Sequence, residues 1–128
     1  MPGQKQFHMY LSHINVTMPM GEDDKARSFY SGCLGLREIP KPQTFGTCGG
    51  LWFDVGGLEL HISAEEQCDR CDGRRHFGFG CGDIERLKAK LEAAGVRVEE
   101  ARQKPWKRFF VHDPFGNRIE IHAPGLCV

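Results

Sequence analysis

Apolar and polar residues alternate along several short stretches of the chain, as they do in strands that bury one face. In the first half the alternation predicts strands, at Tyr10–Met18, Leu51–Val55 and Leu58–Ser63, with a weaker strand at Arg37–Ile39. In the second half it predicts strands at His76–Cys81, Val96–Val98, Phe109–His112 and Arg118–Ala123. A Gly-Gly turn at residues 56–57 joins two of these strands in a hairpin.

Two segments have the helical period instead. Residues Asp23–Leu34 place an apolar face on every third or fourth position, and acidic residues lead the first turn. A second helix begins at Asp83 and stops at Gly95, with its apolar face formed by Ile84, Leu87, Leu91 and Ala94. Each half of the chain is therefore predicted to run strand–helix–strand–strand–strand.

The two halves are also similar in sequence. Leu58–Ile62 and Ile119–Ala123 both read apolar–Glu–apolar–His, and each follows a glycine-containing turn. His13 lies 46 residues before Glu59, and His76 lies 44 residues before Glu120. Matched positions of this kind indicate a duplicated unit. We expect one domain over 1–128, with module one at about 9–66, a linker at about 67–75 and module two at about 76–124.

Four residues with metal-binding side chains share the polar faces of these strands. They are His13, Glu59, His76 and Glu120, and the alternate positions beside them are apolar. If the two polar faces turn inward, the four side chains converge on a cleft. Imidazole and carboxylate donors suit a divalent metal such as nickel, cobalt, zinc or iron. A carboxylate beside the metal can act as a catalytic base, which makes Glu59 and Glu120 the candidates.

Other side chains lie near these four. His61 and His122 follow the two glutamates by two positions, so each shares the face of its glutamate. They are candidates to orient a ligand or contact a substrate, one of them can replace Glu59 as ligand, and an ordinary polar strand position is the alternative. Trp52 and Arg108 either line a substrate pocket or contribute packing.

The cysteines offer a rival zinc site. Cys68, Cys71, His76 and Cys81 have the spacing of a zinc knuckle, a nucleic-acid-binding module. A continuous strand would place His76 and Cys81 on opposite faces, because an odd number of positions separates them. The alternatives are a redox pair or metal clip formed by Cys68 and Cys71 in the linker, or two free thiols on a loop.

Charge and composition narrow the function classes. The chain has 128 residues with 17 Lys+Arg and 17 Asp+Glu, so its formal net charge is zero. This balance argues against a general nucleic-acid or membrane-surface binder. The first residues are polar and no apolar run is long enough for a membrane span, which predicts a cytoplasmic protein with a small-molecule partner.

Several motifs spread over both halves carry a family resemblance. They are Leu11–Val16 (LSHINV), Arg27–Tyr30 (RSFY), Leu34–Leu36 (LGL), Leu58–Leu60 (LEL), His76–Phe79 (HFGF), Leu91–Val96 (LEAAGV) and Asp113–Glu120 (DPFGNRIE). With them, residues about 9–124 resemble the glyoxalase/bleomycin resistance/extradiol dioxygenase superfamily, also called vicinal oxygen chelate proteins. The resemblance implies an α+β fold, in which two tandem βαβββ modules form a cup-shaped mixed sheet with helices on its outer face.

The resemblance also implies a site and an activity. The family's metal ligands match His13, Glu59, His76 and Glu120, a pattern similar to glyoxalase I (lactoylglutathione lyase). It implies an isomerase that acts by metal-assisted enolisation, with Glu59 or Glu120 moving the proton. One alternative is an iron(II) extradiol-type dioxygenase that uses His13, His76 and Glu120. Another is a metal-free protein that binds a small molecule, as bleomycin resistance proteins do. A homodimer is common in the family, with the cleft inside one chain or shared by two.

Overall fold

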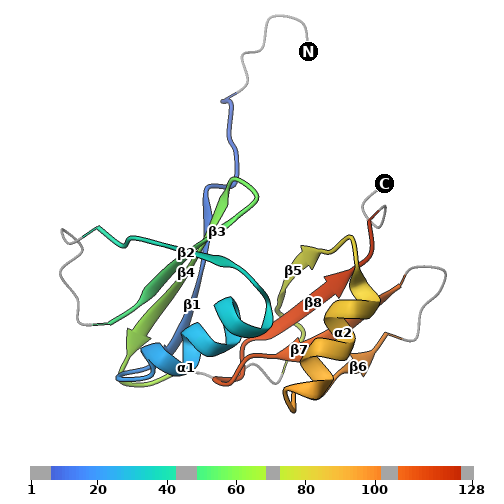
Figure 1. Ribbon diagram of the computed structural model, residues 1–128. Coiled ribbons are helices and arrows are strands. Elements are labelled where there is room, and N and C mark those ends of the chain that lie inside the picture. Colours follow the sequence, from blue (N-terminus) through green and yellow to red (C-terminus); the bar gives the residue numbers. More distant parts are fainter. Residues whose placement is uncertain (1–6, 43–48, 69–72, 102–106, 125–128) are drawn as a thin grey trace, which may run out of the picture.

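Two four-stranded sheets with the same strand order organise the molecule (Figure 1). The computed structural model describes residues 7–42, 49–68, 73–101 and 107–124. The first sheet, in the order β1-β4-β3-β2, contains β1 (His13–Pro19), β2 (Arg37–Ile39), β3 (Leu51–Val55) and β4 (Leu58–Glu65). The second, in the order β5-β8-β7-β6, contains β5 (Phe77–Gly80), β6 (Glu99–Glu100), β7 (Arg108–His112) and β8 (Arg118–His122).

In each sheet the strands that come first and last in the chain are neighbours and run parallel, β1 with β4 and β5 with β8. The other neighbouring strands are antiparallel. Helix α1 (Asp23–Arg27) follows β1 after a short turn and continues directly into η1 (Ser28–Cys33). Helix α2 (Ile84–Ala93) follows β5. This arrangement confirms the predicted α+β fold of two βαβββ modules. The strands form two separate mixed sheets in the described residues rather than one continuous sheet.

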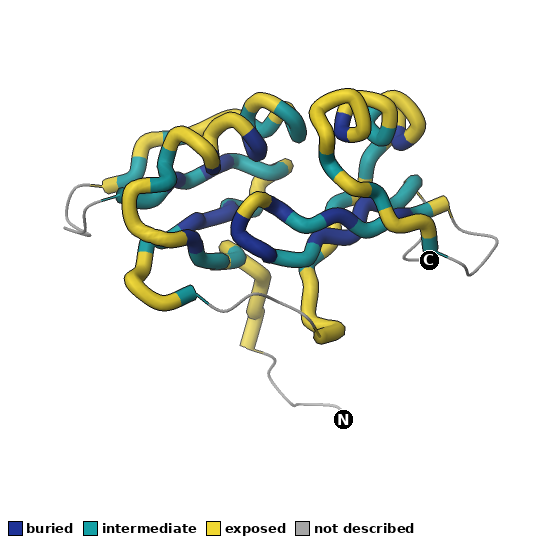
Figure 2. The backbone as a smooth tube through the Cα atoms, turned by 90° about the horizontal axis from the view of Figure 1, so that it is seen from below, coloured by how far each residue is buried: buried dark blue, intermediate teal, exposed yellow. Residues whose placement is uncertain are grey.

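The core lies between the helices and the apolar faces of the strands. Buried residues follow the middle of the strands, the inner sides of the helices and the β7–β8 turn (Figure 2). Leu60 and Ile62 of β4 are buried, and so are Ile119 and Ile121 of β8, where Ile121 is the equivalent of Leu60 in the repeat. The alternation in the sequence therefore identified the buried face correctly in both copies of the repeat.

Two strand predictions need correction. The predicted strand at Tyr10–Met18 begins only at His13, because β4, its neighbour, starts its pairing where Glu59 lies beside His13. The predicted strand at Val96–Val98 is wrong, because this segment ends α2: the Val96 N–H donates to the carbonyl of Leu91. The strand forms instead at β6, where Glu99 and Glu100 pair with β7.

The first helix also differs in detail from the regular helix predicted over Asp23–Leu34. From Ser28 it continues as a wider π-helical turn, in which the Leu34 N–H donates to the carbonyl of Phe29, five residues back. This turn buries Tyr30 completely. The helix stops before Gly35, whose φ of 72° favours glycine.

A buried hydrogen-bond network joins the two modules. The Tyr30 hydroxyl, from module one, donates to the Asp113 carboxylate in the β7–β8 turn at 2.5 Å. The same carboxylate accepts from the backbone N–H groups of Phe115 and Asn117 and from the Asn117 side chain. The Asn117 amide also donates to the carbonyl of Thr17 on β1, at 2.9 Å. The pKa of the Tyr30 hydroxyl is raised well above its ordinary value. Burial is the largest cause, and the negative charge of Asp113 is the next.

Tyr30→Phe should lower the free energy of unfolding by about 1–3 kcal/mol, because a buried carboxylate loses a donor. The wild-type protein should also lose stability above about pH 10, where a tyrosine in the unfolded chain ionises but Tyr30, with its raised pKa, stays protonated. This contribution is complete below about pH 10 and disappears as the pH rises towards the pKa of the folded state. Urea unfolding across this range measures both effects.

The control for this prediction is Tyr10→Phe, at a side chain that is 86% exposed. It should leave the unfolding free energy unchanged. Equal stability of Tyr30→Phe and the wild type at neutral pH, with the same alkaline loss in both, would show that the Tyr30–Asp113 bond does not hold the modules together.

Candidate functional site

The polar face of the first sheet carries His13, Glu59 and His61 as predicted. In the register of β1 and β4, His13 lies beside Glu59, and Asn15 lies beside His61. On the other side of β4, Trp52 of β3 lies directly beside His61. This face borders a cavity of about 680 Å³, which is lined by these five residues and by others from the segment before β1.

Three rings form a stack on this face. The Trp52 and His61 rings lie 3.8 Å apart at 6° to each other, and the His61 and His13 rings lie 4.5 Å apart at 17°. The middle imidazole, His61, is buried, and its Nε2 is 3.0 Å from a carboxylate oxygen of Glu59. On the other side of the His13 ring, Nδ1 is 2.9 Å from the hydroxyl of Ser12. Ser12 was not among the predicted residues, although it directly precedes His13.

The polar face of the second sheet carries a different pair. The Nδ1 atom of His76 is 2.8 Å from the backbone carbonyl of Arg74, and its Nε2 is 3.1 Å from Oε1 of Glu120. A carbonyl oxygen can only accept a hydrogen bond, so Nδ1 carries the proton of the neutral ring. In the neutral ring with that proton, the lone pair of Nε2 would face a carboxylate oxygen. Two acceptors this close require a positive charge, which is either an additional proton on the imidazole or a metal cation.

Cationic side chains surround this pair. The Glu120 side chain is only 10% exposed, and its second oxygen lies 3.6 Å from the Arg108 guanidinium. The Arg118 guanidinium stacks 4.0 Å from the centre of the Phe110 ring, which contacts the His76 ring edge-on. Arg108 therefore lies beside a predicted ligand, as expected of a residue that lines the site.

His122 differs from His61 although both occupy the same place in the repeat. Its Nδ1 is 3.0 Å from the carbonyl of Ala123, and its ring covers Gly80, where an added Cβ would approach Cε1 to 3.4 Å. The structure gives it no hydrogen bond to Glu120 among the described residues; that carboxylate is bonded to His76 instead.

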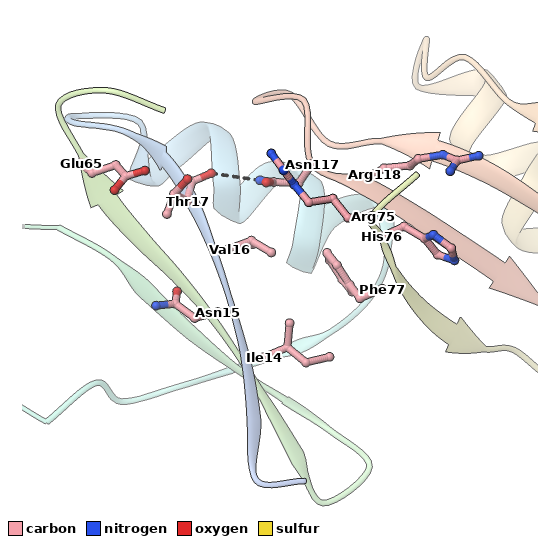
Figure 3. Close-up of a pocket in the computed structure, with 10 residues that line it drawn as sticks. All are labelled: Ile14, Asn15, Val16, Thr17, Glu65, Arg75, His76, Phe77, Asn117 and Arg118. Atoms are coloured by element: carbon pink, nitrogen blue, oxygen red, sulfur yellow. Dashed lines mark hydrogen bonds between the residues drawn. The ribbon is translucent and has the colours of Figure 1, made fainter. Parts of the chain in front are cut away.

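The structure brings the predicted ligands together as two pairs and not as one cluster. No group of three or more His, Cys, Asp or Glu residues able to hold a metal occurs in the described segments of the chain. His13 and Glu59 line the cavity on the first sheet. His76 lines a different cleft of about 360 Å³ between the modules (Figure 3). There it lies near Arg75 and Arg118 and across from Asn15 on β1, as the figure shows.

The rival zinc knuckle can be compared only in part, because Cys71 lies outside the described residues. His76, which the knuckle would need, faces Glu120. The Cys68 thiol lies 3.9 Å from the carbonyl of Glu65, and Cys33, Cys68 and Cys81 are free thiols. Among the described residues, no helix is long and apolar enough to cross a membrane.

Comparison with known proteins identifies relatives over most of the chain. The model of the Glyoxalase/Bleomycin resistance protein/Dioxygenase superfamily matches residues 10–121. A glyoxalase family protein from Bacillus anthracis has the same fold with a TM-score of 0.86 and 36% identity, covering 94% of this chain and 98% of the other. FosX of Listeria monocytogenes, solved with Mn(II) and sulfate, shares the fold with a TM-score of 0.74 at 19% identity, covering 94% of each chain.

Two curated proteins are similar in sequence. Glutathione transferase FosA of Serratia marcescens is 26% identical over 93% of this chain and 85% of its own length. An Arabidopsis thaliana protein named as a probable chloroplastic lactoylglutathione lyase is 25% identical over 88% of this chain. The match covers 35% of the Arabidopsis protein, so this chain spans about a third of it.

The hydrogen bonds predict which nitrogen of each ring carries the proton. In its neutral form, the ring of His76 should carry its proton on Nδ1, and the ring of His61 should carry its proton on Nε2. Long-range proton–nitrogen NMR of metal-free protein distinguishes the two forms. His61 is the internal contrast, because its Nε2 faces a carboxylate and its ring has no carbonyl partner on Nδ1 in the structure. A proton on Nε2 of His76 would mean that the ring donates to Glu120 and presents no lone pair to a metal.

Proposed function

The chain belongs to the Glyoxalase/Bleomycin resistance protein/Dioxygenase superfamily, and we propose that it is a divalent-metal-dependent enzyme with a lactoylglutathione-lyase-like isomerase activity. One observation carries the metal part of this proposal: Nε2 of His76 lies 3.1 Å from the carboxylate of Glu120, while its Nδ1 lies 2.8 Å from the carbonyl of Arg74. A cation placed there receives a nitrogen and an oxygen donor, the set that nickel, cobalt, zinc and iron accept. His13 and Glu59 supply a matching set on the first sheet.

We further propose that a second copy of the chain completes the site. Within one chain His13 and Glu59 line one cavity, and His76 lines another. The segment before β1 extends away from the body, and Phe7, Met9 and Tyr10 on it are 86%, 88% and 86% exposed. Apolar side chains so exposed mark an interface. A symmetric homodimer would bring this segment, and the pair that follows it, to the partner's second sheet.

The chain's own residues divide the work of such a site. A bound divalent metal polarises a substrate oxygen and acidifies the neighbouring C–H bond. Glu120, held by His76 and next to Arg108, is fixed in place as a ligand. Glu59, whose side chain is 40% exposed, is the more accessible carboxylate and the better proton carrier. It would take the proton from one substrate carbon and return it to the adjacent carbon, which leaves the overall charge and oxidation level unchanged.

An iron(II) extradiol-type dioxygenase is the second candidate. The observation that favours it is the hydrogen bond from His61 to Glu59, which occupies one oxygen of that carboxylate at 3.0 Å. His13, His76 and Glu120 would then be the three protein ligands, as in the two-histidine, one-carboxylate arrangement of non-heme iron enzymes. A metal-free binding protein is the remaining alternative. In that case the wild-type protein binds no metal, and substitution of His76 or Glu120 changes nothing in the measured metal content.

Metal analysis tests the shared site. The wild-type protein, loaded with Co²⁺ and freed of excess, should hold about one equivalent per chain, and His13→Ala and His76→Ala should each lose it. If the two variants are co-expressed, about half of the dimers are mixed and each mixed dimer has one intact site, so about a quarter of an equivalent per chain should return.

Cys68→Ser is the control for metal binding and should keep the full metal content. A mixture that regains no metal would place the site within a single chain. A wild-type protein that holds no metal would leave the metal-free binding protein, and loss of metal in Cys68→Ser would support the knuckle.

The isomerase activity has its own test. Nickel- or cobalt-loaded protein should convert the hemithioacetal of methylglyoxal and glutathione to the thioester, and Glu59→Gln should slow this by about 100-fold or more. Glu92→Gln, at an exposed position of α2 that lines neither cavity, is the matched control and should retain the rate. Metal-loaded protein without turnover would rule out the isomerase, and ring cleavage of a catechol by the iron(II) form would then establish the dioxygenase.

A further inference from the structure

The repeat contains an asymmetry that its sequence does not show. His61 and His122 follow Glu59 and Glu120 by the same two positions, yet only His61 bonds its glutamate. In module two the glutamate is bonded instead by His76, the histidine just before the first strand of that module. In module one the equivalent first-strand histidine, His13, stacks on His61.

We propose that His61 is a positioning residue, which holds both His13 and Glu59 in place for the metal; this inference rests on the proposed function. The Nε2–H of His61 fixes one oxygen of Glu59, at 3.0 Å. The face of the same ring lies against the His13 imidazole, at 4.5 Å and 17°. One side chain thus restrains both members of the ligand pair on the first sheet.

Trp52 explains why His61 can do this. The indole lies 3.8 Å from the His61 ring and almost parallel to it, on the side away from His13. The imidazole is therefore held between two flat rings, and its side chain is only 11% exposed. His13 itself is exposed at the start of an edge strand, with a hydrogen bond to the exposed Ser12 hydroxyl. A ligand already held in its bound rotamer loses less conformational entropy when the metal binds.

The cross-strand neighbours account for the difference between the modules. Trp52 on β3 is the cross-strand neighbour of His61, whereas Arg108 on β7 is the cross-strand neighbour of His122. On the other side, Asn15 lies beside His61 on β1, and Gly80 lies beside His122 on β5. His122 thus has no ring on which to stack in the described structure and instead covers the bare backbone of Gly80.

Co²⁺ binding tests the proposal without a known substrate. His61→Phe keeps a flat ring but loses the donor to Glu59, and His61→Gln keeps an N–H donor but loses the ring. Each should weaken Co²⁺ binding by about tenfold and change the visible absorption of the bound ion, because partners of metal ligands typically affect affinity by about 10- to 100-fold. His122→Phe is the matched control, and it should bind Co²⁺ with wild-type affinity and spectrum.

A coupling measurement separates positioning from a general effect on folding. If His61 acts partly through Glu59, the loss caused by His61→Phe should be smaller in a Glu59→Gln background than in the wild type. A merely destabilising change would give the same loss in both backgrounds. Circular dichroism identifies any variant that does not fold, and Trp52→Leu, which retains His61, should then show a smaller loss in the same direction.

The outcomes distinguish this inference from the proposed function. Wild-type affinity and spectrum in both His61 variants would overturn the inference and leave the metal site intact. Loss of all binding in both variants would make His61 a ligand and overturn its positioning role. Failure of the wild-type protein to bind Co²⁺, as well as nickel, zinc or iron, would overturn the proposed function and the inference with it.

Discussion

In each module the first strand runs parallel to the last, and the site depends on this pairing. It places His13 beside Glu59 on the first sheet, and it brings His76, just before β5, to Glu120 on the second. A slip of one residue would turn either histidine or glutamate to the opposite face. The register is fixed by the buried residues between the polar ones, Leu60 and Ile62 in β4 and Ile119 and Ile121 in β8. Burial of each such side chain contributes about 1.5–3 kcal/mol, so the core holds the polar face in place.

The contacts between modules determine how these faces lie within one chain. The Tyr30–Asp113 bond and the Asn117–Thr17 bond tie the first helix and β1 to the β7–β8 turn. This joint is buried and strongly hydrogen-bonded, which favours one arrangement of the modules. In that arrangement His13 and Glu59 line one cavity and His76 lines another, and the exposed apolar segment before β1 lies away from both sheets' cores. The proposed shared site in a dimer would unite the two pairs.

The sequence pattern predicts the strand faces well because burial imposes a period of two on them. It correctly places Glu59 and Glu120 on polar faces and identifies β2 despite its proline neighbours. It does not distinguish His61 from His122, because their difference arises from Trp52 and Arg108 on neighbouring strands. The proton on Nδ1 of His76 likewise depends on a backbone carbonyl, at Arg74, which no side-chain motif records.

Pairing also explains the two strand errors. Tyr10 continues the alternation of β1 but lies beyond the end of β4, and so has no neighbour with which to pair. Val96 is apolar and β-branched, yet its N–H closes the end of α2. In both places the local sequence favours a strand. Whether a strand forms there depends on whether a neighbouring strand lies within reach for pairing.

A crystal structure of the cobalt-loaded protein, with anomalous diffraction recorded at the cobalt edge, tests the central claim most directly. The account predicts one cobalt peak per chain, bound by His13 and Glu59 of one copy and by His76 and Glu120 of the other. A cobalt peak at Cys68 would contradict the account. So would a cobalt peak that is bound by only one of the two pairs.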